Sequence, residues 1–140
     1  MVGSVLAIPF NDESFDVVSC CEILEHLPYI EFSNALKEIR RVSQKHVVLS
    51  LPDATTVYRV NIELPRIRPI KILVNHPSHR PVDHVFDGEH FWEIGKKGYS
   101  VKQIEFDITH SELSIVNTYR VYEFYYQRFF VLEKTGCLYG

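Results

Sequence analysis

The stretch Ile8-Pro9-Phe10-Asn11-Asp12-Glu13-Ser14-Phe15-Asp16-Val17-Val18, followed by Glu22-Ile23-Leu24-Glu25-His26-Leu27, decides the fold. Its centre, Phe15 to Cys20, is a short apolar run bounded by turn-forming residues, which is typical of a strand buried on both faces of a parallel sheet. The chain of 140 residues is long enough for one domain with its own core.

Helix and strand patterns alternate after this run. Apolar residues recur at helical spacing from Pro28 to Val42, and a run rich in branched residues from His46 to Leu51 predicts the next strand. A strand, a helix and a strand in close succession predict a βαβ unit with parallel strands.

The second half of the chain is less regular. Between Ala54 and Glu89 we expect a helical piece around Val57 to Leu64 and then a long loop, because four prolines interrupt the region. A third helix should begin at Ser100, which has the spacing of a capping box with Gln103. Two aromatic and branched runs, 113–121 and 127–133, predict an antiparallel pair.

Composition excludes several classes of protein. Hydrophobic residues make up 46% of the chain, yet no apolar stretch is long enough to cross a bilayer, and the start does not read as a secretory signal, so we expect a cytoplasmic protein without membrane contact. Cys20, Cys21 and Cys137 are too few for a disulfide framework and are expected to be reduced. A net charge of -3 gives no overall electrostatic attraction to nucleic acid.

The order of these patterns resembles the second half of the class I S-adenosylmethionine-dependent methyltransferases of the type 11 kind. In that family a loop of the form D-x-x-x-L-P-F-x-D-x-S-F-D-V-V precedes the fourth strand. The resemblance implies an α/β, Rossmann-like half-sheet of parallel strands with a C-terminal antiparallel hairpin and helices on its faces, a single domain over 1–134 and a flexible tail over 135–140. The segments that carry it are 8–18, 36–42, 46–52, 88–91 and 128–132.

One family motif has no counterpart. The family's first strand ends in a Gly-rich turn that approaches the cofactor, whereas the six glycines here include no G-x-G pair. The chain therefore resembles a truncated methyltransferase domain that retains the fourth, fifth, seventh and sixth strands in that spatial order. The strand at 15–20 would then be an apolar edge, which we expect a second copy or a partner chain to cover.

The resemblance also assigns cofactor contacts. Ser4 and Val5 match the positions that read the adenine edge, although the family usually has an acid where Ser4 stands. Cys21 and Glu22 follow the fourth strand and would face the sulfonium end of S-adenosylmethionine. Without the resemblance these are ordinary residues of a loop and a strand end.

Glu22-x-x-Glu25-His26 is the chemically densest motif. On a helical turn these three residues share a face, so two carboxylates and an imidazole could bind one divalent metal ion. The motif resembles the metal site of small-RNA 2′-O-methyltransferases and ubiquinone-pathway O-methyltransferases, but a pocket-lining role for His26 is the competing interpretation. A further ligand could come from one of the histidines in the long loop, unless these are only solvated loop residues: His76, His79, His84 and His90.

Two functions remain open from the sequence. The first is an S-adenosylmethionine-dependent methyltransferase-like protein with an unknown acceptor, incomplete as a catalyst, in which His26 and His90 are the candidate bases. The alternative is a non-catalytic assembly or binding module, with or without the metal site. The region between Ala54 and Glu89 carries basic residues that suit either an anionic acceptor or a solvated face: Arg59, Arg66, Arg68, Lys71 and Arg80.

Overall fold

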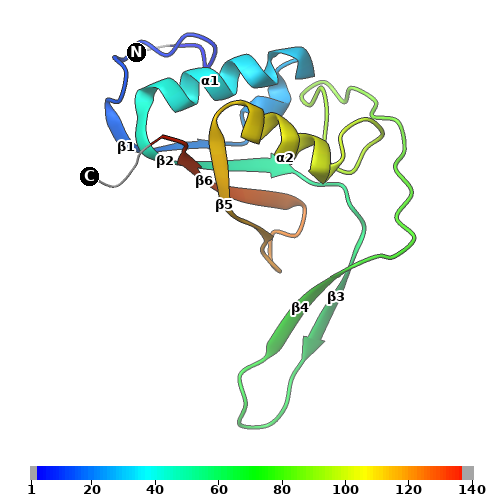
Figure 1. Ribbon diagram of the computed structural model, residues 1–140. Helices are drawn as coiled ribbons and strands as arrows, with labels where there is room; N and C mark the ends of the chain where they lie inside the picture. The colour runs from blue at the N-terminus through cyan, green and yellow to red at the C-terminus, as the bar shows by residue number, and fades with distance from the viewer. Residues whose placement is uncertain (1–2, 137–140) are drawn as a thin grey trace.

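Four strands form the central sheet of the chain, of which the computed structural model describes residues 3–136 (Figure 1). They lie in the order β1-β2-β6-β5, with β1 parallel to β2 and β6 antiparallel to both of its neighbours. The predicted α/β half-sheet with a C-terminal antiparallel hairpin is therefore confirmed. The strands span Phe15–Cys21 (β1), Ser43–Pro52 (β2), Leu113–Arg120 (β5) and Gln127–Lys134 (β6).

Both α-helices pack on the same face of this sheet (Figure 1). Helix α1 (Phe32–Val42) turns its apolar residues at spacings of three and four toward β2, since that stripe is the only surface it can remove from water. A short 3-10 turn, η2 (Tyr29–Glu31), occupies the first part of the predicted helix. The buried core beneath α1 and α2 (Val101–His110) includes Leu36, Ile39, Val47, Leu49, Leu51, Trp92, Ile104, Ile108, Phe130 and Leu132.

β1 is the edge strand of the sheet, which agrees with the strand order that the sequence predicted. The expectation that this strand is buried on both faces is wrong, because only Cys20 of β1 is buried and Phe15 and Val17 are exposed. A strand at an edge has a neighbour on one side only, so its hydrogen-bonding groups and part of its side chains stay open. What covers this edge stays a prediction.

The helix predicted around Val57 to Leu64 is wrong as well. Residues 57–75 form a two-stranded antiparallel ribbon, β3 (Val57–Ile62) and β4 (Ile70–Asn75), which projects from the body of the molecule (Figure 1). Apolar and polar residues alternate from Tyr58 to Ile62 of β3, which is the period of a strand and not of a helix. We call residues 57–75 the arm.

Three expectations concern the C-terminal tail, the cysteines and the membrane. The tail expected over 135–140 lies, from residue 137 on, outside the described residues, as does Cys137. Cys20 and Cys21 are free thiols, in agreement with the sequence. Within residues 3–136 we find no helix of the length and apolar character that a bilayer crossing requires.

Candidate functional site at the carboxyl end of the parallel strands

A sharp turn after β1 positions Glu25 and His26. Glu22 adopts a left-handed backbone conformation with φ of 54°, and its N–H donates to the Ser50 carbonyl of β2 at 3.3 Å. The chain then forms a single 3-10 turn, η1 (Leu24–His26), closed by a hydrogen bond from the Leu27 N–H to the Leu24 carbonyl. This turn lies at the carboxyl end of the parallel pair, where open α/β sheets bind their ligands.

Three hydrogen bonds tie a distant loop to η1. The Phe91 N–H donates to the Glu25 carbonyl at 2.8 Å, and the Trp92 indole N–H donates to the Leu27 carbonyl at 3.1 Å. His26 Nδ1 lies 2.9 Å from the Glu89 carbonyl oxygen. Because Trp92 is fully buried among aromatic rings, this anchor fixes the loop and places His90 beside η1.

The two histidines are held in matching tautomers. A carbonyl oxygen only accepts, so His26 Nδ1 carries a proton and donates it to the Glu89 carbonyl. His90 Nδ1 donates to the Glu93 carboxylate at 3.3 Å and lies 3.6 Å from the Asp87 carboxylate. Both Nε2 atoms therefore present a lone pair, in the arrangement that carboxylate and carbonyl partners give to metal-binding histidines.

Glu25 is the most unusual side chain of the site. It is fully buried, and neither of its carboxylate oxygens has a hydrogen-bond partner in the described part of the chain. Burial, the largest influence, raises the pKa of Glu25 above its ordinary value, although the nearby His26 and His90 act in the opposite direction. A carboxylate left in this state lacks the cation or donor that would satisfy it.

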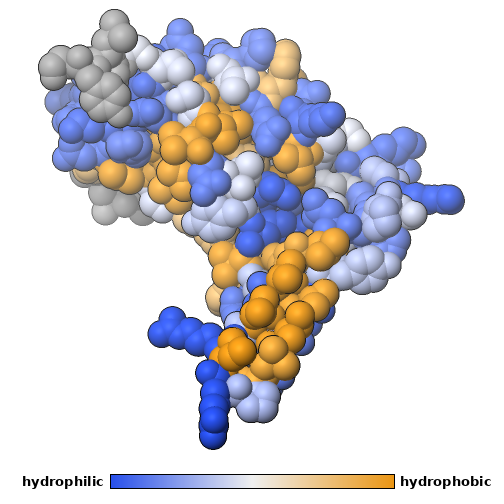
Figure 2. Space-filling model, turned by 60° about the horizontal axis from the view of Figure 1, so that its bottom comes forward, coloured by the Kyte–Doolittle hydropathy of each residue, from blue (hydrophilic) through white to orange (hydrophobic). Residues whose placement is uncertain are grey.

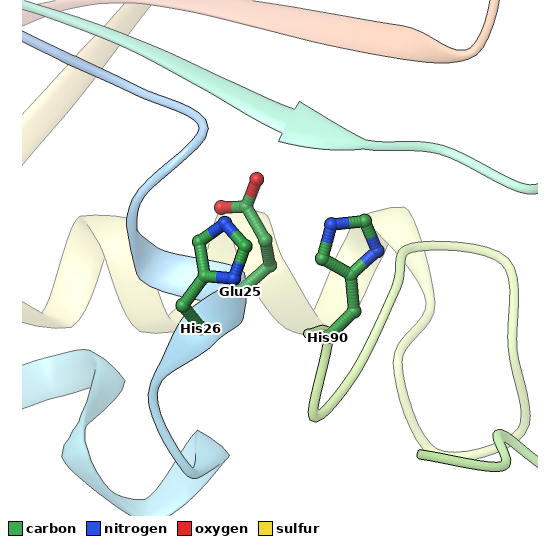
Figure 3. A group of neighbouring side chains, drawn as sticks. All are labelled: Glu25, His26 and His90. Carbon is green, nitrogen blue, oxygen red and sulfur yellow. The ribbon is translucent and has the colours of Figure 1, made fainter. Parts of the chain in front are cut away.

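Glu25, His26 and His90 converge on one point (Figure 3). One ligand atom from each lies within 4.8 Å of the others, and the two imidazole rings are 5.1 Å apart between centroids. The three side chains line an acidic cavity of about 560 Å³ between η1, the end of β2 and the start of β6. Its other lining residues include Glu22, Asp53, Glu89, Glu93, Tyr126 and Gln127.

A second, apolar cavity of about 300 Å³ lies beside β1. Ser4 and Val5 line it from the N-terminal segment, and Cys20 and Ile23 line it from the strand end. Residues 20–25 thus contribute to both cavities, so the end of β1 stands between the positions assigned to adenine and the acidic cavity.

The structure groups the predicted residues differently from the sequence motif. Glu22 lines the same cavity as Glu25 and His26 but is not among the side chains that lie within 4.8 Å of one another. Its left-handed backbone takes it out of the helical turn that the i, i+3, i+4 argument requires. Cys21 is exposed, with its Sγ 3.3 Å from the Ser19 hydroxyl.

Of the four loop histidines, His90 alone enters the described metal-ligand cluster with Glu25 and His26. His79 accepts a hydrogen bond from the Thr56 N–H and donates from Nε2 to the Gly95 carbonyl. His76 accepts from the Ser78 N–H, and His84 Nε2 donates to the His90 carbonyl. These three histidines organise the loop that carries His90.

Sequence reasoning missed the residues that form the far wall of the cavity. Asp53 follows β2 directly and is buried, with Arg128 at 2.8 Å and Arg120 at 3.6 Å. Its position at the carboxyl end of a parallel strand was a usable signal. Gln127 and Glu93 gave no such signal. Gln127 reaches the site because β6 pairs antiparallel with β2, which sets Gln127 opposite Pro52, and Glu93 reaches it because the loop is anchored at Trp92.

Comparison with known proteins agrees with this geometry. Residues 1–51 match the family model described as a methyltransferase domain. The uncharacterized protein MJ0638 of Methanocaldococcus jannaschii is 46% identical over 40 residues, which span 29% of this chain and 16% of that protein.

Solved structures extend the likeness to almost the whole chain. An S-adenosylmethionine-dependent methyltransferase from Clostridium acetobutylicum superposes with a TM-score of 0.59 and 8% identity, over 97% of this chain and 64% of its own. Magnesium protoporphyrin IX methyltransferase from Synechocystis PCC 6803, with bound S-adenosylhomocysteine, gives a TM-score of 0.56 at 16% identity. The match covers 96% of this chain and 50% of that enzyme. The chain thus spans about half to two-thirds of these structures.

The fold is that of the class I S-adenosylmethionine-dependent methyltransferases, so the resemblance inferred from the sequence is confirmed. The spatial order β1-β2-β6-β5 agrees with the order that the resemblance implied for the retained fourth, fifth, seventh and sixth strands of that fold.

Proposed function

We propose that the chain takes part in S-adenosylmethionine-dependent methyl transfer, and that the acidic cavity receives the methyl acceptor. The observation that carries the proposal is the convergence of His26 and His90 on this cavity, at the carboxyl end of β1 and β2 in a methyltransferase fold. The solved structures with bound S-adenosylhomocysteine or S-adenosylmethionine have the same fold, which supports the same cofactor here.

The two cavities suit the two ends of the reaction. Ser4 and Val5, in the apolar cavity, are the proposed contacts of the adenine. Cys21 and Glu22, at the end of β1, are the proposed contacts of the sulfonium end. A methyl group held over this strand end would face the acidic cavity, so the reaction would depend mainly on aligning the acceptor with the sulfonium.

His26 and His90 are the proposed bases for an acceptor that must lose a proton. Each has its Nδ1 engaged as a donor, which leaves the Nε2 lone pair to accept a proton from an acceptor hydroxyl or amine. The carboxylates of Glu25 and Glu93 lie near the rings and would stabilise the imidazolium that forms.

A divalent metal ion at Glu25, His26 and His90 is a second candidate for this site. The residues fit such an ion, because Glu25 offers two buried oxygens without partners and both histidines offer Nε2. One carboxylate and two imidazoles suit Zn²⁺ or Mn²⁺. When bound, the ion would act as a Lewis acid on the acceptor oxygen.

Binding measurements test the two parts separately. Calorimetric titration with S-adenosylhomocysteine should give saturable binding that Glu22→Lys weakens and the distant Lys102→Glu does not. No binding would favour the alternative of a non-catalytic module. For the metal, titration with Mn²⁺ should saturate in the wild type and fail in Glu25→Met; equal behaviour of both chains would remove the metal ion from the proposal.

A further inference from the structure

One face of the arm consists entirely of apolar side chains. Antiparallel pairing sets Tyr58 opposite Val74, Val60 opposite Ile72, and Ile62 opposite Ile70. Because side chains alternate between the two faces of a ribbon, these six lie together on one face, where Figure 2 shows a continuous hydrophobic stripe. No charged residue interrupts it.

This face is open to solvent along its whole length. The six side chains are 38–53% exposed, and Leu64 and Ile67 near the tip are 51% and 59% exposed. Exposure on this scale amounts to roughly 500–700 Å² of apolar surface, at or above the upper end of the range for the largest patch of a soluble monomer. A two-stranded ribbon is marginally stable on its own, so a second layer on this face would stabilise the arm.

The opposite face of the arm is held by its own chain. Lys71 Nζ lies 2.6 Å from the Glu123 carboxylate, and the Arg59 guanidinium lies over the Tyr125 ring, 4.6 Å from its centroid. Both partners belong to the turn between β5 and β6. These contacts orient the arm and leave the apolar face pointing away from the turn.

We propose that a second copy of this chain binds the apolar face, so that two arms pack against each other around a two-fold axis. A two-fold axis places the same face of both copies against each other, and an uncharged face tolerates this because no like charges meet. Two copies with their tips would bury on the order of 1,000–1,400 Å², around the lower limit of stable interfaces.

A bilayer surface fits this arm less well. An arm that binds anionic lipid needs free cations around an apolar tip. Of the four basic residues on the arm, Arg59 and Lys71 are engaged by the β5–β6 turn, which leaves Arg66 and Arg68. The apolar surface also runs along the full ribbon and is not concentrated at the tip. A protein surface with the same shape is the better match.

The oligomeric state of the full chain tests the proposal. In sedimentation velocity at micromolar concentration, the wild type should have the mass of two 16.4 kDa chains. Ile72→Lys places a charge on the apolar face of both copies and should weaken association on the order of 100-fold, which corresponds to about 2.7 kcal/mol. Asn75→Lys introduces the same charge on the opposite face of the same strand and should leave the dimer intact.

Hydrogen exchange of the wild type tests the same proposal without a substitution that could disturb folding. In the wild type, peptides from residues 57–75 should become more protected as protein concentration rises, while peptides from β2 should not change. A monomer at all concentrations would overturn the proposal, and so would a dimer that survives Ile72→Lys but dissociates in Val17→Lys, since the β1 edge would then be the interface. If the chain is monomeric and floats with phosphatidylserine vesicles, the apolar face binds a bilayer and the proposal of a second copy is wrong.

Discussion

Replacing Glu25 by methionine should stabilise the metal-free chain. Glu25 is fully buried, and both of its oxygens lack a partner among the described residues. An unsatisfied buried polar group costs about 1–3 kcal/mol, and more when it is charged, whereas an apolar side chain of similar shape removes that cost. We expect Glu25→Met to raise the free energy of unfolding by about 1–3 kcal/mol, or roughly 3–5 °C of melting temperature per kcal/mol for a domain of this size.

The effect should depend on pH with a definite sign. Burial raises the pKa of Glu25 in the folded state, so folding is favoured by the protonated form. That contribution is fully present below the unfolded-state pKa and is lost as pH rises through the folded-state value. The advantage of Glu25→Met over the wild type should therefore grow from acidic to neutral pH.

Thermal unfolding in buffer with a chelator, followed by circular dichroism, measures this difference. Glu22→Gln is the matched control, because Glu22 lines the same cavity but is exposed, and its change should stay within about 0.5 kcal/mol. Addition of Mn²⁺ at 100 times its dissociation constant should stabilise the wild type by about 2.7 kcal/mol and leave Glu25→Met unaffected. A destabilised Glu25→Met in chelator would refute the reasoning, since Glu25 would then have a partner in the folded chain.

Three further predictions concern other parts of the molecule. Asp53→Ala should lower the free energy of unfolding by about 3–5 kcal/mol in denaturant titration, because it leaves two largely buried arginines without their carboxylate, whereas Asp83→Ala at an exposed pair should change little. Iodoacetamide should label the exposed Cys21 well before Cys20, since burial raises the pKa of Cys20 to about 12; equal labelling in tandem mass spectrometry would contradict this. Ser100→Ala removes the cap of α2 and should cost about 1 kcal/mol, whereas no change in melting temperature would show that the cap contributes little.

The parts of the fold that the sequence predicted are those with local patterns. The apolar residues of α1 recur at helical spacing, and the runs of β1 and β2 are short apolar stretches next to turn-forming residues. The prediction for the arm, a helical piece around Val57 to Leu64 followed by a loop, was wrong, because prolines interrupt the region and no core chooses between the two faces of the ribbon. The alternation of apolar and polar residues from Tyr58 to Ile62 was nevertheless the signal of a strand.

In the site, too, residues that are close in the chain could be predicted and residues from distant segments could not. Glu25 and His26 are neighbours in the chain, so the motif alone brings them together. Glu22 fails to join them because a left-handed turn, which its spacing does not reveal, separates it from η1. Gln127 and Trp92 reach the site only through pairing and packing between distant segments, and such contacts cannot be read from local spacing.

Nuclear magnetic resonance titration with S-adenosylhomocysteine tests the central claim most directly, because backbone amide shifts detect weak binding and locate it. We expect saturable shifts at Ser4 and Val5 and at Cys21 and Glu22, on the two sides of the β1 end. Amides of the arm should not move. An absence of shifts at millimolar ligand, or shifts confined to residues away from the end of β1, would contradict a role for this chain in methyl transfer.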